Sequence, residues 1–144
     1  MLNINIICAG SGKVREEYLR NAVAEYEKRI SAYARVKFIE ADEDDDSILA
    51  AIPQRSYVFA LCIGGEQLSS EAFASCLERV TLSGFSTVSF IIGGSNGFGK
   101  IIEEKADFRL SFSKMTFPHR LMRVILLEQI YRALSINHGG KYHK

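Results

Sequence analysis

The sequence has few of the residues that cross-link or anchor a small protein. It contains no tryptophan, two prolines and three cysteines among 144 residues. The cysteines, Cys8, Cys62 and Cys76, are odd in number, far apart and embedded in apolar segments. That pattern fits neither a disulfide framework nor the ligand spacing of a metal site. We expect reduced, buried thiols and no bound metal.

Long apolar runs are also absent. No run approaches the roughly 20 residues needed to cross a bilayer, and the amino terminus lacks the order of charged, apolar and small residues that marks a signal peptide. We therefore expect a cytoplasmic protein that does not enter a membrane. A chain of 144 residues with 47% hydrophobic content can bury its own core, so we expect one domain spanning residues 1–144.

Positive charge is scarce overall but concentrated toward the end of the chain. The formal net charge of +1 argues against binding to nucleic acid through bulk charge. From Arg109 onward, however, seven Lys or Arg residues stand against one acid, Glu128, which gives +6 and leaves −5 for the first 108 residues. Such an asymmetry predicts a surface for a polyanion, although a basic face that keeps a protein in solution gives the same pattern.

Apolar periodicity predicts strands that alternate with helices. Alternating or continuously apolar segments predict strands at Leu2 to Ala9, Arg35 to Ala41, Tyr57 to Ile63, Ser86 to Ile92 and Asp107 to Ser113. Spacings of three and four, with capping residues, predict helices at Val14 to about Tyr33, Ser47 to near Pro53, after Ser69 or Ser70, and Pro118 to Ile136. The alternation indicates an α/β fold with a mostly parallel sheet flanked by helices.

In such sheets, ligands bind beyond the carboxyl ends of the strands. The loops expected there are Gly10 to Lys13, Gly64 to Glu66, Gly93 to Gly99 and Ser113 to Pro118. The acidic run Asp42 to Asp46 lacks the spaced ligand pattern of a calcium loop, so we interpret it as a solvated loop.

Two of the loops are rich in glycine. "AGSGKVR" resembles a phosphate loop, but Ile7, Val14 and Arg15 stand where the Walker and dinucleotide motifs need other residues, so a plain turn is favoured. "IIGGSNGFG" places adjacent glycines at the end of a buried strand. Without a Cβ, such residues let a flat ligand such as adenine approach the backbone.

The closing segment carries the histidines. His119 lies at a predicted helix start, where the helix dipole disfavours a cationic ring and favours a neutral ring that accepts a proton; a solvated residue with no role fits equally well. The tail "GGKYHK" is either a frayed terminus or a segment whose Tyr142 stacks on a base while its lysines hold phosphate.

The segments "FIIGGSNG", "LSFSKMTFPHRLMRVILLEQIYRA" and the terminal "YHK" resemble the RlmH family of bacterial SPOUT methyltransferases. The likeness extends to "AEYEKRI" and "LSSE", and so spans the whole chain. It implies methylation of N3 of a pseudouridine in 23S rRNA, and a small protein without a separate RNA-binding domain suits a base within the assembled ribosome.

The resemblance also implies a SPOUT-type fold with a deep C-terminal trefoil knot and a homodimer with active sites at the subunit interface. No spacing in the sequence predicts a knot, because knots are essentially absent from proteins in general. The implied methyl donor is S-adenosyl-L-methionine, held by residues that match Leu61, Gly93, Phe112, Ser113, Lys114, Met115, Thr116 and Phe117. The chain departs from its relatives at Cys62 and Glu66, where an acid and a lysine are usual.

We hypothesise that His119, or His143 of the partner subunit, accepts the proton that the acceptor nitrogen must lose. The residues expected to bind RNA are Arg123, Arg132, Lys141, Tyr142 and Lys144. Two other classes stay open. One is a non-catalytic ribosome-binding or assembly module, and the other is a nucleotide-dependent oxidoreductase or kinase that rests on "AGSGK" alone.

Overall fold

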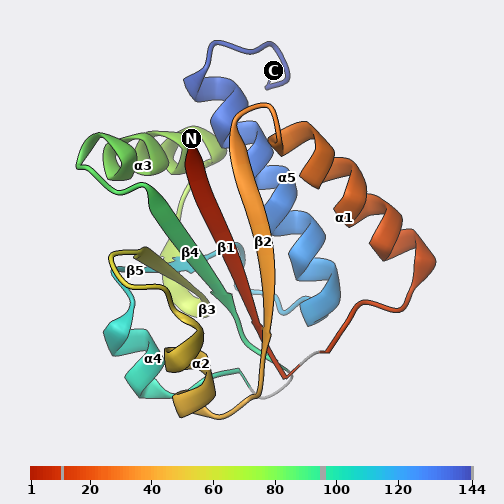
Figure 1. Cartoon of the computed structure of the whole chain (residues 1–144), viewed down its shortest axis with the longest axis vertical. Helices are drawn as coiled ribbons and strands as arrows, with labels where there is room; N and C mark the ends of the chain where they lie inside the picture. Colours follow the sequence, from red (N-terminus) through yellow and green to blue (C-terminus); the bar gives the residue numbers. More distant parts are fainter. Residues whose placement is uncertain (11, 95–96, 144) are drawn as a thin grey trace.

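The structure is a computed structural model that describes residues 1–10, 12–94 and 97–143. Within these residues, five strands form one parallel sheet in the order β2-β1-β4-β3-β5 (Figure 1). The strands are β1 (Leu2–Ala9), β2 (Ala34–Ala41), β3 (Tyr57–Gln67), β4 (Thr87–Ile92) and β5 (Phe108–Ser111). All carboxyl ends therefore meet at one edge of the sheet.

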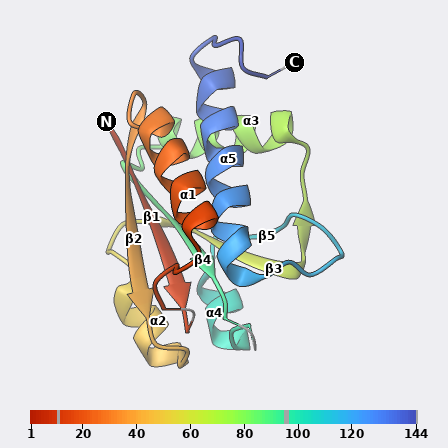
Figure 2. The same ribbon diagram turned by 90° about the vertical axis from the view of Figure 1, so that its right-hand side faces the viewer.

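Helices cover both faces of the sheet. One face carries α1 (Glu17–Ile30), α3 (Ser70–Leu82) and α5 (His119–Asn137), and the other carries α2 (Asp45–Ala51) and α4 (Lys100–Lys105) (Figures 1 and 2). This cover explains the continuously apolar strands, because a strand buried on both faces has no polar side. Successive residues of β1 illustrate it: Ile6 belongs to the larger core and Ile7 to the smaller one.

The helix α5 occupies the centre of the larger layer, between α1 and α3 (Figure 2). Its buried side chains are Arg123, Leu126, Leu127, Ile130, Ala133, Leu134 and Ser135. The sequence suggests an apolar stripe through Leu121, Val124, Ile125, Leu127 and Leu134, but the buried face is rotated from it, since Leu121 is exposed and Val124 and Ile125 are half-buried. No helix in the described ranges is long and apolar enough to cross a bilayer.

The predicted α/β class and the mostly parallel sheet are confirmed. The prediction of a solvated loop at Asp42 to Asp46 is wrong in part, because Asp44 caps α2 through the Ser47 N–H at 2.8 Å and the next two acids form its first turn. The sequence did not predict α4, and β3 extends beyond its predicted end at Ile63 to Gln67. The trefoil knot and the single-domain boundaries stay predictions.

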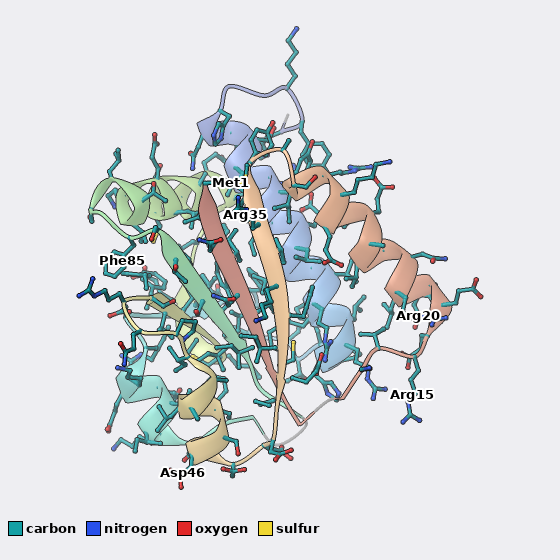
Figure 3. All side chains as sticks on the ribbon, viewed as in Figure 1. Met1, Arg15, Arg20, Arg35, Asp46 and Phe85 are labelled. Carbon is teal, nitrogen blue, oxygen red and sulfur yellow. The ribbon has the colours of Figure 1, made fainter. Side chains whose placement is uncertain are left out.

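Charged side chains project from the ends of the surface helices (Figure 3). Arg15 and Arg20 are exposed at the beginning of α1, and Asp46 projects from α2. The beginning of α1 adjoins the beginning of α5, because Glu16 and Arg120 form an ion pair at 3.5 Å. Exposed cations therefore lie at the end of the molecule where α5 begins.

Candidate functional site

A cavity of about 690 Å³ lies at the carboxyl ends of β3, β4 and β5. Its wall comes from these strand ends, the following loops, α4 and the first turn of α5. The lining residues are Leu61, Cys62, Ile63, Ile92, Gly93, Gly94, Gly97, Phe98, Glu103, Leu110, Ser111, Phe112, Ser113, Met115, Thr116, Phe117, Pro118, His119 and Met122. The described residues of the "AGSGK" loop do not line it.

The segment between β5 and α5 forms one wall of the cavity. Ser111 Oγ donates to the carbonyl of Ser113 at 3.0 Å, and Ser113 Oγ accepts the backbone N–H of Met115 at 3.0 Å. These short-range bonds curl the chain before Pro118, which stands at the N-cap of α5. The curl leaves Met115 75% exposed at the rim.

The glycine loop after β4 closes against itself. A Cβ on Gly93 would lie 2.9 Å from both the Cα and the carbonyl carbon of Gly97. The sequence suggested that a ligand needs the space that a Cβ on Gly93 would occupy. In the structure, the backbone of the loop itself fills that space. Glycine is therefore required at position 93 for the loop to form, before any ligand arrives.

Residues of the acidic run support this loop from the beginning of α2, which lies in the same layer as α4. The Gly99 N–H donates to Asp45 Oδ1 at 3.2 Å, and a Cβ on Gly94 would lie 3.1 Å from Glu43 Oε1. Acids that looked like a solvated patch thus shape the wall of the cavity.

The wall is mostly apolar, with a few polar groups among its described residues. Glu103 and His119 are the ones that can carry charge at neutral pH, and Ser113 and Thr116 add hydroxyls. Burial, followed by the charge of Glu103, raises the pKa of the Cys62 thiol. The thiol therefore stays protonated and acts as part of the wall rather than as a nucleophile.

The structure gathers most of the predicted cofactor residues at this cavity. Leu61, Gly93, Phe112, Ser113, Met115, Thr116 and Phe117 line it, whereas Lys114 is exposed and lies outside its wall. His119 lines it as well. Their roles toward a cofactor stay predictions, but residues 61, 93, 112, 113 and 115–117 meet at one place.

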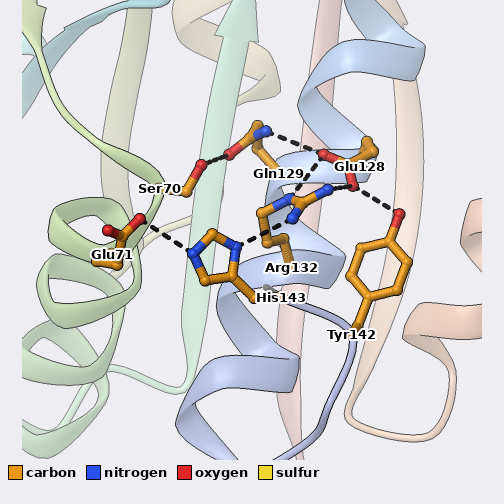
Figure 4. Close-up of polar contacts among 7 residues, drawn as sticks. All are labelled: Ser70, Glu71, Glu128, Gln129, Arg132, Tyr142 and His143. Atoms are coloured by element: carbon orange, nitrogen blue, oxygen red, sulfur yellow. Dashed lines mark hydrogen bonds and ion pairs between the residues drawn. The ribbon is translucent and has the colours of Figure 1, made fainter.

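The tail lies at the far end of α5 in a polar network with α3 (Figure 4). Glu128 accepts from Arg132 Nη2 at 2.8 Å and from the Tyr142 hydroxyl at 2.8 Å. His143 Nε2 lies 3.1 Å from a carboxylate oxygen of Glu71, and its Nδ1 lies 3.0 Å from Arg132 Nη1. The tail is therefore packed against its own chain.

This network assigns the tautomer of His143. Because a guanidinium can only donate, Nδ1 accepts from Arg132, and the ring proton lies on Nε2 facing Glu71. The lone pair that a base needs is thus already engaged. His119, which lines the cavity, suits the role of base better than His143 does in this conformation.

One predicted RNA contact, Arg123, lies elsewhere than the prediction required. Arg123 is 3% exposed, and its guanidinium donates to both carboxylate oxygens of Glu40 at 2.8 and 2.9 Å and to the Gly12 carbonyl at 2.7 Å. That position does not suit a phosphate contact. Lys141 is exposed, Arg132 and Tyr142 are half-buried, and Lys144 lies outside the described residues.

Several lining residues were missed from the sequence. Ile92 and Ser111 are the last residues of β4 and β5, and both strands were predicted. The rule that ligands bind beyond the carboxyl ends of parallel strands could therefore have pointed to these two residues. Glu103 lies on α4, whose six residues are too few to show helical periodicity. No sequence signal pointed to that carboxylate.

Comparison with known proteins identifies the family. The family profile described as "Predicted SPOUT methyltransferase" matches residues 2–143. The chain therefore belongs to the SPOUT methyltransferase family.

Relatives named "Ribosomal RNA large subunit methyltransferase H" match nearly the whole chain. The protein of Carboxydothermus hydrogenoformans is 45% identical, with 98% of this chain and 100% of the relative covered. That of Clostridium novyi is 45% identical, with 99% and 100% covered. A solved structure described as "a probable methylase family protein from Haemophilus influenzae Rd KW20" shares the fold, with a TM-score of 0.59 at 11% identity over 98% of this chain and 70% of that one.

Proposed function

We propose that this protein transfers a methyl group from S-adenosyl-L-methionine to N3 of a pseudouridine in 23S rRNA of the assembled ribosome. Membership of the SPOUT methyltransferase family supports the reaction class, and the names of the relatives support ribosomal RNA of the large subunit as substrate. The observation that carries the proposal is the cavity, where separated segments of the chain meet beside His119.

The cavity fits such a methyl donor. Its volume of about 690 Å³ is in the range of small-molecule sites, and its apolar wall beside glycine backbone suits a flat base with polar edges. Leu61, Gly93 and the segment Phe112–Phe117 would hold the donor. When bound, it supplies an electrophilic methyl group whose transfer leaves a neutral thioether. We further propose that this segment belongs to a trefoil knot.

His119 is proposed as the base. Methylation at N3 needs the N3 proton to leave as the new N–C bond forms, and His119 is positioned at the cavity to take it. A positioned general base contributes roughly 10²-fold or more to the rate.

The second subunit is proposed to complete the site. Tyr142 and His143 contact Glu128, Arg132 and Glu71 of their own chain and do not line its cavity, so we propose that the tail serves a cavity in another copy. Met115, Phe117 and Leu121 are 75%, 37% and 36% exposed beside the cavity and offer apolar surface for a homodimer.

The RNA surface is proposed to combine this tail with cations near the cavity. Arg132, Lys141, Tyr142 and Lys144 keep their predicted roles in the proposal, while the buried Arg123 is left out. Lys114, exposed next to the cavity, is added as a phosphate contact.

The test is single-turnover methylation of ribosomes that lack the modification, with the His119→Gln variant. We expect its rate to fall about 10²-fold while affinity for S-adenosylmethionine stays within twofold. His138→Gln is the matched control, because that exposed ring donates from Nδ1 to the Leu134 carbonyl and does not line the cavity. An unchanged rate in His119→Gln would remove His119 as base. Wild-type protein that binds ribosomes but never methylates them would favour the assembly module.

A further inference from the structure

Glu103 enters the proposed cofactor cavity from the layer opposite to α5. It lies on α4 and is half-buried between the cavity and a second hollow beside Arg109, whereas the next residue, Glu104, is exposed and borders that second hollow but not the cavity. Neither the sequence motifs nor the family likeness assigns Glu103 a role.

Glu103 dominates the charge of the cavity wall. Among the described lining residues it is the one carboxylate, and none of them is a lysine or arginine. Arg109, which lines the second hollow together with Glu103, is exposed to solvent. At Cys62 the charge of Glu103 raises the thiol pKa more than the charge of Arg109 lowers it.

We propose that Glu103 makes the cavity prefer a cationic methyl donor over the uncharged-sulfur product. This inference rests on the proposed function. S-adenosylmethionine carries a sulfonium, and S-adenosylhomocysteine carries a thioether in its place, while the two are otherwise alike. A carboxylate in the wall therefore attracts the sulfonium of the donor but not the thioether of the product. It raises the affinity for the donor relative to the product and so favours exchange of spent product for fresh donor.

The size of the preference follows from simple electrostatics. A carboxylate and a sulfonium several ångströms apart in a partly solvated site attract each other by about the free energy that changes affinity tenfold. Salt weakens this attraction. A group that only bound the shared adenosine part would change both affinities alike.

The test is calorimetric titration of the full-length protein with S-adenosylmethionine and, separately, S-adenosylhomocysteine. In Glu103→Gln, we expect the donor to bind about tenfold more weakly and the product to change by less than twofold. Glu104→Gln removes the same charge one residue away and is expected to change neither. Glu103→Asp keeps the charge and is expected to keep the preference, which separates charge from shape.

Equal weakening of both ligands in Glu103→Gln, an unchanged ratio of affinities, or the same change in Glu104→Gln would overturn the proposal while leaving the methyltransferase function in place. Wild-type protein that binds neither ligand would instead defeat the proposed function, and this inference with it.

Discussion

At the tail end of α5, Glu128, Arg132, Tyr142 and His143 are hydrogen-bonded to one another, whereas at its beginning His119 faces an apolar cavity. The same helix thus carries a closed polar network at one end and an open site at the other. Polar groups that satisfy one another stabilise a conformation, and groups that face a cavity remain available to a ligand. The contrast supports the proposal that the chemistry takes place at the beginning of α5.

Arg123 lies near the cavity end of the helix but is as fully bonded as the tail network. We predict that Arg123→Ala lowers the free energy of unfolding by about 3 kcal/mol, because it leaves Glu40 and the Gly12 carbonyl without a buried partner. Arg132→Ala should cost about 1 kcal/mol, since its pair with Glu128 is partly solvated. Urea unfolding of both variants measures the difference, and equal losses would break the distinction between the two arginines.

A substitution at Gly93 tests whether the cavity at the beginning of α5 depends on the backbone of the glycine loop. We predict that Gly93→Ala weakens S-adenosylmethionine binding at least about tenfold, because the added Cβ would displace the Gly97 backbone at the cavity wall. Gly64→Ala is the control, since its Cβ would meet nothing within 4 Å. Calorimetry and circular dichroism on both variants give the answer. Equal affinity in Gly93→Ala would show that the loop tolerates the shift.

A substitution at Tyr142 tests the polar network of the tail, and it has the smallest expected effect. We predict that Tyr142→Phe destabilises the protein by about 0.5–1 kcal/mol at neutral pH, because Glu128 loses one donor. Faster hydrogen exchange of the tail should accompany the loss.

The effect of Tyr142 should depend on pH. Burial, followed by the hydrogen bond to Glu128, raises the pKa of Tyr142 from 10.0 to about 12. A raised pKa in the folded state means that the contribution is complete below pH 10 and is lost as the pH rises toward 12. The stability gap between wild type and Tyr142→Phe should therefore shrink over that interval, and a constant gap would contradict the assigned bond.

The sequence predicted the strands well because burial on both faces leaves a continuous apolar signal, as in β1. It missed α4 because six residues hold less than two helical turns, and with α4 it missed Glu103. The extension of β3 through Gly64 and Gly65 was hidden, since glycine is a poor strand former and the pairing of Glu66 with Leu110 is non-local.

The site was predicted in outline through family resemblance rather than periodicity. Residues 61, 93 and 112–117 are far apart in sequence, and chain topology alone brings them together. The burial of Arg123 did have a signal, because it lies three and four residues before Leu126 and Leu127 on the core face. The positive charge of Arg123 suggested a surface position instead, and that suggestion was wrong.

Hydrogen–deuterium exchange with and without S-adenosylmethionine tests the central claim most directly. We predict slower amide exchange in the segment Ser113–Phe117 and around Gly93 when the donor is bound, because those segments wall the cavity. Unchanged exchange there, with protection around Gly10 and Gly12 instead, would contradict the placement of the site and favour the "AGSGK" loop.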